Sequence, residues 1–282
     1  MELRDLSDIS MDEIVTAFQN AFSDYAVGFD RTQISRMLIR RGYVGKLSFA
    51  AFECGRIVAF TLTGIGEYSG VRSCYDCATG VSPEYRGRGL SRELLGMAMR
   101  RIRDCGVSRY VLEVLQSNDK AISLYYDHGF RIVRDYDCYN QSVEALRFTK
   151  ITDPGLDIRS AGIEVVGKMA SFCDFAPSWQ NSLDSIVRGR ENLIVNIARL
   201  SGTPVGYCVI DPDNGDIAQI AVSRNHRRQG IASSLLSSVM DYMHSPTMKA
   251  LNIPTDGVSL KSFLEAVNFN KGLSQFEMHR DI

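Results

Sequence analysis

The first half of the chain alternates between helical patterns and short apolar runs. Ile14, Phe18 and Phe22 recur four residues apart, which predicts a helix over about 9–22 with one apolar face. A second helical pattern covers 33–41. Three apolar runs that follow have the length and the bounding turn residues typical of strands: 47–53, 56–64 and 72–81.

A glycine-containing loop follows the third predicted strand. It reads Arg86-Gly87-Arg88-Gly89-Leu90-Ser91 and leads into a helix with apolar residues at Leu90, Leu94, Leu95, Ala98 and Ile102. The remainder of this half predicts a strand, a helix and a final strand, over 110–115, 119–128 and 130–139.

The second half repeats this order of elements. A hairpin around 202–207 matches the one around 55–60, and a predicted strand over 216–222 leads into Arg227-Arg228-Gln229-Gly230-Ile231-Ala232. The apolar stripe of the next helix lies 141 residues after the first stripe, at Ile231, Leu235, Leu236, Val239 and Met243. We therefore expect two copies of one α/β (α+β) fold, over 1–148 and 158–282, joined at 149–157, where Pro154-Gly155 interrupts regular structure.

Composition narrows the classes of protein. With 282 residues, 45% of them hydrophobic, the chain has enough apolar material for two cores without a disulfide or a metal. A net charge of −1 gives no support to nucleic-acid binding, and no apolar stretch is long enough to cross a membrane. Cys74 and Cys77 lie three apart in a strand and so point to opposite faces. We expect no metal site, reduced thiols and a cytoplasmic protein.

The two loops are candidate pyrophosphate sites. A helix start leaves about four backbone N–H groups without partners, and its dipole favours an anion there. A nucleotide-hydrolase loop needs Lys-Ser/Thr after its last glycine, where Leu90 and Ile231 stand instead. The dinucleotide fingerprint needs a third glycine, where Arg92 stands.

These motifs resemble those of the GNAT acetyltransferase superfamily, whose signature is Gln/Arg-x-x-Gly-x-Gly/Ala between its fourth strand and third helix. The second loop matches it fully, and the first has Ser91 where Gly or Ala is usual. The family's downstream element is present as Asn118-Asp119-Lys120-Ala121, Tyr125 and Gly129-Phe130. The resemblance covers nearly the whole chain and implies two tandem domains, each a mixed, mostly antiparallel sheet flanked by helices.

The resemblance also implies acetyl-CoA as the acyl donor. In that family the pantetheine arm inserts between two splayed strands, so Val81 would offer its backbone to the arm and Asn118 would lie beside it. The amides of the first loop, from Arg86 through Gly87, Arg88, Gly89 and Leu90 to Ser91, would hold the pyrophosphate. The counterparts in the second copy are Val222, Arg227, Gly230, Ile231 and Ala232.

Catalysis would need a base for the attacking amine and an acid for the leaving thiolate. Tyr125 has the family's position for the acid; its counterpart is Leu264, or Ala266 in an ungapped alignment, and neither has a hydroxyl. The family's usual base position holds Tyr75, and a strand bulge could turn the adjacent Asp76 into the cleft. Glu113 is a second candidate base, and packing or structural pairing is the alternative role for each of these residues.

The leading hypothesis is an N-acetyltransferase whose first domain acts on a primary amine of a small molecule or peptide. One alternative is that one or both domains bind acyl-CoA without turning it over and act as a structural or sensing module. Another puts catalysis in the second domain, with Asp216 as the base. The sequence favours no particular acceptor and no oligomeric state.

Overall fold

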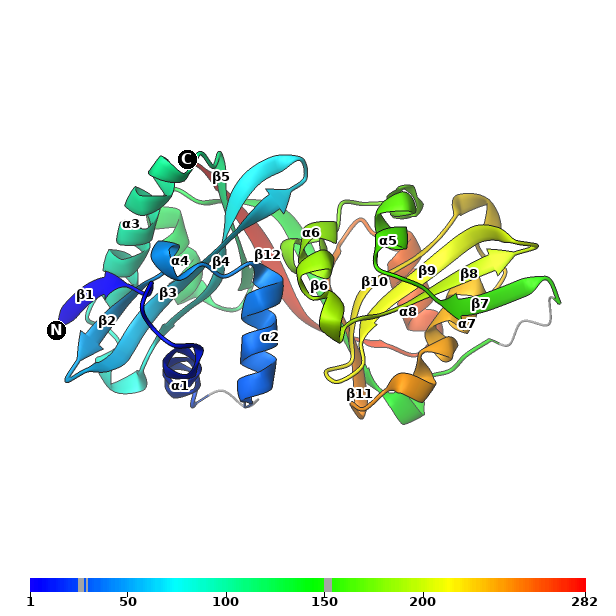
Figure 1. Ribbon diagram of the computed structural model, residues 1–282, viewed down its shortest axis with the longest axis horizontal. Helices are drawn as coiled ribbons and strands as arrows, with labels where there is room; N and C mark the ends of the chain where they lie inside the picture. The colour runs from blue at the N-terminus through cyan, green and yellow to red at the C-terminus, as the bar shows by residue number, and fades with distance from the viewer. Residues whose placement is uncertain (25–27, 29, 150–153) are drawn as a thin grey trace. The chain divides into compact units, whose positions relative to one another are not determined.

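The computed structural model of the protein describes residues 1–24, 28, 30–149 and 154–282. The chain forms two compact units: Met1–Val133 together with Glu277–Ile282, and Arg134–Phe276 (Figure 1). Each unit is a mixed sheet with helices, which confirms the predicted fold class. Four residues of the predicted join at 149–157, namely 150–153, lie outside the described residues.

The first unit follows the predicted order of elements. Its sheet has the strand order β1-β2-β3-β4-β5, and the last residues of β12 lie beside β5. The strands are β1 (Glu2–Asp5), β2 (Phe49–Glu53), β3 (Arg56–Tyr68), β4 (Val71–Val81) and β5 (Arg109–Leu115). The helices are α1 (Met11–Ala21), α2 (Arg31–Arg41), α3 (Leu90–Ile102) and α4 (Asp119–Asp127).

Helices cover both faces of this sheet, because neighbouring residues of β3 point to opposite sides. Phe60 lies against Phe18 of α1, with the ring centroids 6.1 Å apart. Ala59 packs with Leu90 and Leu94 of α3 on the other side. All five residues of the predicted apolar stripe of α3 are buried. The apolar periodicity that predicts these helices therefore also identifies the side that each turns to the core.

The second unit contains the first residues of β12 and the strand order β6-β11-β10-β9-β8-β7. Its strands are β6 (Arg131–Ser142), β7 (Leu156–Ser160), β8 (Ile194–Leu200), β9 (Thr203–Asp211), β10 (Asp216–Val222), β11 (Thr247–Pro254) and β12 (Asn270–Asp281). Its helices are α5 (Glu164–Lys168), α6 (Leu183–Arg188), α7 (Ile231–Ser238) and α8 (Val258–Ala266).

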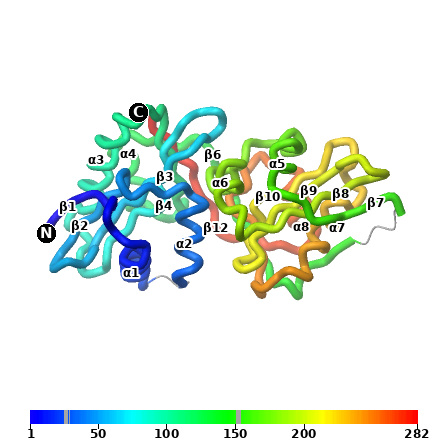
Figure 2. The backbone as a smooth tube through the Cα atoms, in the orientation of Figure 1, coloured from blue at the N-terminus to red at the C-terminus, as the bar shows by residue number. Residues whose placement is uncertain are grey.

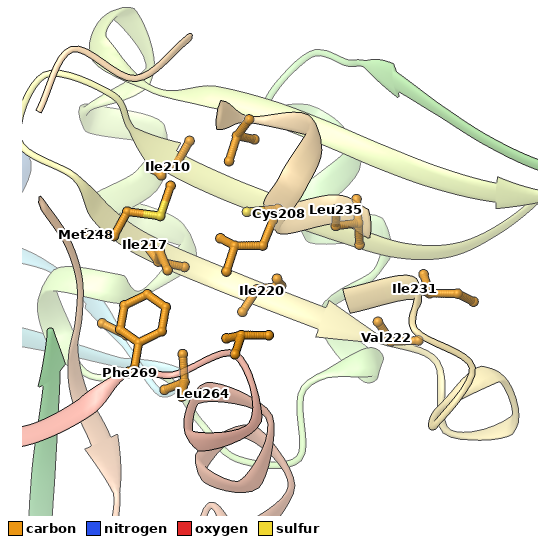
Figure 3. Close-up of a cluster of buried hydrophobic side chains, with 14 of the residues drawn as sticks. Cys208, Ile210, Ile217, Ile220, Val222, Ile231, Leu235, Met248, Leu264 and Phe269 are labelled. Atoms are coloured by element: carbon orange, nitrogen blue, oxygen red, sulfur yellow. The ribbon is translucent and has the colours of Figure 1, made fainter. Parts of the chain in front are cut away.

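Two apolar clusters cover the faces of the second sheet. Cys208 and Ile210 of β9 pack with residues of α7 and α8, among them Leu235 and Leu264 (Figure 3). Tyr207 and Val209 of the same strand pack on the other face, against Val166, Met169 and Ile186. The second unit is thus also a sheet between two layers of helix.

The division into units does not follow the order of the chain at β6 and β12. From Arg134 onward β6 belongs to the second unit, whereas Glu277–Ile282 at the end of β12 return to the first (Figure 2). The predicted ranges, 1–148 and 158–282, follow the chain order and do not contain this exchange. That each of those ranges is a functional domain stays a prediction.

Residues 277–282 are fixed to the first unit by a buried polar cluster. The Tyr68 hydroxyl donates to Glu277 Oε2 at 2.8 Å, and His279 Nε2 lies 2.5 Å from Glu277 Oε1. Glu277 is only 1% exposed. A further contact is the Ile282 N–H, which donates to the Ser108 carbonyl at 3.2 Å.

We expect Glu277→Ala to lower the free energy of unfolding by about 1–3 kcal/mol, because it leaves buried hydrogen-bonding groups without their acceptor. Chemical denaturation at neutral pH measures the loss. The matched control is Glu67→Ala, an exposed glutamate beside Tyr68, which should change stability by less than about 0.5 kcal/mol. Equal effects of the two substitutions would contradict a structural role for the cluster.

Candidate functional site

The central strands of the first unit separate after a short stretch of pairing. β4 and β5 pair in parallel at 73–75 and 109–111. Just beyond this stretch, β4 has a bulge: Thr63 of β3 is paired with Asp76, and Leu62 with Ala78, so that Cys77 is the extra residue. The bulge therefore lies just after Tyr75, where the described ladder between β4 and β5 ends.

An arginine from α2 contacts this bulge. Arg41 Nη1 donates to the Cys77 carbonyl at 2.6 Å. The end of α2 can approach because Gly64 has no side chain: a Cβ there would lie 2.3 Å from the Arg41 carbonyl oxygen. The bulge is thus supported from the neighbouring helix by a charged donor.

Three polar side chains meet beside the bulge. Asp76 Oδ2 accepts hydrogen bonds from the Tyr125 hydroxyl and from Thr79 Oγ1, each at 2.9 Å. Asp76 and Tyr125 are 6% and 7% exposed. The structure therefore brings together the predicted acid and the predicted base, and it adds Thr79, which the sequence analysis did not identify.

Burial dominates the electrostatics of this cluster. It raises the pKa of Asp76 from 3.8 to about 6, although hydrogen bonds from Tyr125 and Thr79 oppose the shift. Burial, followed by the charge of Asp76, raises the pKa of Tyr125 well above 10.0. At neutral pH the cluster therefore holds a carboxylate that can accept a proton and a phenol that retains its own.

Glu113, the other candidate base, belongs to a neighbouring group. Its Oε2 accepts from the Tyr75 hydroxyl at 2.8 Å, and the Arg41 guanidinium lies over the Tyr75 ring, 5.9 Å from its centroid. Burial and the charge of Glu113 raise the pKa of Tyr75 well above 10.0. Tyr75, at the family's usual base position, therefore keeps its proton.

The first loop exposes backbone to an incoming anion. Gly87 and Gly89 both have φ of 77°, and a Cβ built at either would meet no atom within 4 Å. Gly89 is the N-cap of the 13-residue helix α3. Open space, positive φ and a helix start together form a cradle that fits a pyrophosphate.

The Arg86 side chain has a structural role in this cradle. Its Nε donates to the Val81 carbonyl at 3.1 Å, and its Nη2 donates to the Ala21 carbonyl at 2.9 Å. Its Nη1 pairs with Asp24 at 2.5 Å, and this hydrogen bonding lowers the pKa of Asp24. Arg86 thus ties the loop to the end of β4 and to α1, and its backbone remains the part proposed for phosphate contact.

Asn118 also has a local partner. It is the N-cap of α4, and its Oδ1 accepts from the Ala121 N–H at 3.2 Å. That contact fixes the start of the helix that carries Tyr125. Its predicted position beside the pantetheine arm stays a prediction.

The second unit repeats this backbone geometry closely. Arg227 Nε donates to the Val222 carbonyl at 3.0 Å, and its Nη1 pairs with Asp174 at 2.6 Å. Gly230 has φ of 77° and is the N-cap of α7, so it matches Gly89. β10 has its bulge at Ala218, which is 141 residues after Cys77.

The residues equivalent to the Asp76 cluster are aliphatic in the second unit. Ile217 and Ile220 take the places of Asp76 and Thr79. The Phe269 N–H donates to the Leu264 carbonyl at 2.8 Å, just as the Phe130 N–H donates to that of Tyr125 at 3.0 Å, so Leu264 rather than Ala266 is the counterpart of Tyr125. These three aliphatic residues belong to one buried cluster (Figure 3).

A cavity of about 380 Å³ opens along the second loop. It is lined by Arg227, Gly230, Ile231 and Ala232 of the loop, by Val222 of β10 and by residues of α8. Asp216, the alternative base, is 5% exposed, starts β10 and lies outside the lining of this cavity. The predicted cofactor residues of the second unit therefore surround one space.

Two further findings concern the described part of the chain. Among those residues no cluster of three His, Cys, Asp or Glu side chains has the arrangement of a metal site. No helix there is long and apolar enough to span a membrane.

Comparison with known proteins agrees with the two-unit architecture. The sequence profile of the acetyltransferase (GNAT) family matches residues 11–130 and 168–259. A solved tandem GNAT protein from the clavulanic acid biosynthesis pathway superimposes with a TM-score of 0.72 at 13% identity, over 99% of this chain and 98% of that one. A GCN5-related N-acetyltransferase from Sphaerobacter thermophilus gives a TM-score of 0.71 at 16% identity, over 99% and 95%.

A curated relative is similar over a shorter region. N-alpha-acetyltransferase MAK3 of Arabidopsis thaliana is 32% identical over 103 residues, 36% of this chain and 54% of the relative. The match thus spans about half the length of that relative. The profile matches most of the chain, one region in each half, and both units have the corresponding strand–loop–helix. The chain belongs to the acetyltransferase (GNAT) family.

Proposed function

We propose that this protein transfers an acetyl group from acetyl-CoA to a primary amine of a small molecule or peptide, and that the first unit catalyses the reaction. The observation that carries the proposal is the buried hydrogen bond between Tyr125 and Asp76, beside the β4 bulge. The pair adjoins the separation of β4 and β5, and the first loop begins five residues after Val81 ends β4.

Acetyl-CoA, when bound, supplies an activated thioester that an amine can attack. Asp76, with its pKa raised to about 6, is ionised at neutral pH and accepts the proton that the amine loses. The N–C bond then forms and the C–S bond breaks, and Tyr125 donates its proton to the departing thiolate.

The order of these proton transfers follows from the Asp76 charge. While Asp76 is ionised, its charge helps to hold the pKa of Tyr125 well above 10.0. Once Asp76 takes the amine proton, that charge disappears and Tyr125 becomes a stronger acid. The Asp76 proton then passes along the 2.9 Å hydrogen bond to restore the phenol. Thr79, which donates to both carboxylate oxygens, keeps Asp76 oriented throughout.

For the second unit we propose binding of CoA or acyl-CoA without turnover. Ile217, Ile220 and Leu264 contain no proton donor or acceptor in their side chains, while the loop and its cavity are retained. Asp216 remains the alternative base, and its position outside the cavity lining favours the first unit.

We expect Tyr125→Phe to lower kcat by about 10²–10⁴-fold, because it removes the hydroxyl that donates the proton and keeps the ring. The affinity for acetyl-CoA, measured by calorimetry, should stay the same. Tyr126→Phe is the matched control, since Tyr126 is the next residue of α4 and is 40% exposed. A Tyr125→Phe enzyme with the turnover of the control would remove Tyr125 from the mechanism.

The pH dependence of kcat/KM should report the ionisation of Asp76. Only its ionised form accepts a proton, so kcat/KM should fall about tenfold per pH unit below about 6. Asp76→Asn should lower activity and remove this limb. A profile of the wild-type enzyme that stays flat down to pH 5 would exclude Asp76 as the base.

Stability gives an independent check of the same group. The pKa of Asp76 is raised from 3.8 to about 6 on folding, so its contribution to stability is present below pH 3.8 and is lost as the pH rises through about 6. Asp76→Asn should therefore be more stable relative to wild type at pH 8 than at pH 4. Thermal melts at both pH values measure this difference.

Substitutions in the two loops identify the catalytic unit. Gly89 and Gly230 both have φ of 77°, so a phenylalanine at either is strained by about 1–2 kcal/mol and obstructs the cradle. We expect Gly89→Phe to lose turnover and Gly230→Phe to retain it, with each variant losing one of two CoA-binding events in calorimetry. The reverse pattern of turnover would locate catalysis in the second unit.

A further inference from the structure

The last residues of the chain contact the helix that carries Tyr125. Arg280 lies near the end of β12, in the part of that strand that belongs to the first unit, and its Nη1 donates to the His128 carbonyl. His128 is the C-cap of α4, three residues after Tyr125. The same Nη1 donates to Met99 Sδ of α3 at 3.4 Å. Arg280 therefore joins the end of the chain to α3 and α4.

The guanidinium of Arg280 lies at the carboxyl end of α4, where a cation is favourable. The last four carbonyls of a helix have no N–H partner further along it, and the helix dipole gives this end a partial negative charge. Gly129, with φ of 84°, follows the C-cap, and a Cβ built on it would lie 3.6 Å from Arg280 Cζ. Arg280 thus holds the turn after α4 by contact, by charge and by a charge-assisted hydrogen bond.

This turn in turn fixes both the backbone and the ring of Tyr125. The Tyr125 carbonyl accepts from the His128 N–H at 3.1 Å and from the Phe130 N–H at 3.0 Å. The rings of Tyr125 and Phe130 meet edge to face, with their centroids 5.7 Å apart, and Phe130 is 0% exposed. A displacement of 128–130 would therefore move the Tyr125 hydroxyl as well.

The contacts on either side of Arg280 fix its position along β12. Glu277 anchors one end of the segment through its buried carboxylate, and the Ile282 N–H anchors the other end on the Ser108 carbonyl at 3.2 Å. Side chains alternate along a strand, so Arg280 points to the face opposite Glu277, together with the fully buried Met278. The guanidinium is thus held against α4 from a strand that is itself fixed.

We propose that Arg280 is a positioning residue for the transfer reaction: it fixes the end of α4 so that the Tyr125 hydroxyl stays at proton-transfer distance from Asp76. This inference rests on the proposed function, because Arg280 acts through the proton that Tyr125 donates. The 2.9 Å hydrogen bond between Tyr125 and Asp76 leaves little tolerance for a shift of the helix. The chain supplies Arg280 only after the whole second unit, so residues 1–133 alone lack this contact.

The first test replaces the guanidinium in the full chain. Arg280→Met removes the donor and the charge and keeps an apolar stem, and a misplacement of about 1 Å can cost on the order of 10²-fold in rate. We expect kcat to fall about tenfold or more, while the affinity for acetyl-CoA, measured by calorimetry, stays the same. Arg280→Lys keeps a cation at the end of the helix and should restore part of the lost turnover.

The matched control is Arg103→Met. It removes an exposed arginine of the first unit whose positive charge acts on Arg280, and it leaves the contact with α4 in place. This control should keep the kcat of the wild-type enzyme, which excludes the loss of one positive charge as the cause.

The decisive measurement repeats Arg280→Met in the Tyr125→Phe protein. There the group that Arg280 positions is already missing, so the second substitution should lower kcat by less than about twofold. A general loss of stability would instead lower kcat by the same factor in both backgrounds. Arg280→Lys serves for the same comparison if Arg280→Met does not fold.

Equal losses in the two backgrounds would overturn this inference, and so would an Arg280→Met enzyme with the kcat of the wild type. Both results would leave the role of Tyr125 intact. A Tyr125→Phe enzyme with undiminished turnover would overturn the proposed function itself, and the positioning role with it.

Discussion

One extra residue in a central strand is the constraint on which both sites depend. Cys77 in β4 and Ala218 in β10 interrupt the regular pairing at equivalent points. The parallel ladder to β5 ends just before the first bulge, and the pairing of β10 with β11, Asp216 with Lys249, lies just before the second. The bulge also shifts the alternation of side chains, which lets Asp76 and Thr79 meet although they lie three residues apart.

The two units show how the same backbone can hold two different sets of side chains beside a bulge. Burial of a carboxylate beside the bulge costs free energy, because the charged form loses its hydration. Groups with such a raised pKa are typical of sites that transfer protons. The second unit avoids that cost with Ile217, Ile220 and Leu264, which add to its apolar core.

Local signals carried most of the sequence prediction. Apolar periodicity identified α1 and α3, and the repeated loop identified both helix starts, because these features depend on residues close together in the chain. Thr79 was missed because regular alternation puts residues three apart on opposite faces, and nothing in the sequence marks which residue is the extra one in a bulge. The exchange of β6 and β12 was missed because an apolar pattern predicts a strand and not the sheet that receives it.

The return of residues 277–282 to the first unit has a consequence for biosynthesis. A ribosome makes the chain from its N-terminus, so β1 to β5 leave it long before the strand that lies beside β5. Until Glu277 is added, Tyr68 lacks its carboxylate acceptor and one edge of the first sheet lacks its neighbour. Completion of the first sheet during translation therefore waits for synthesis of the whole second unit, and the open edge of β5 is exposed to other nascent chains in that interval.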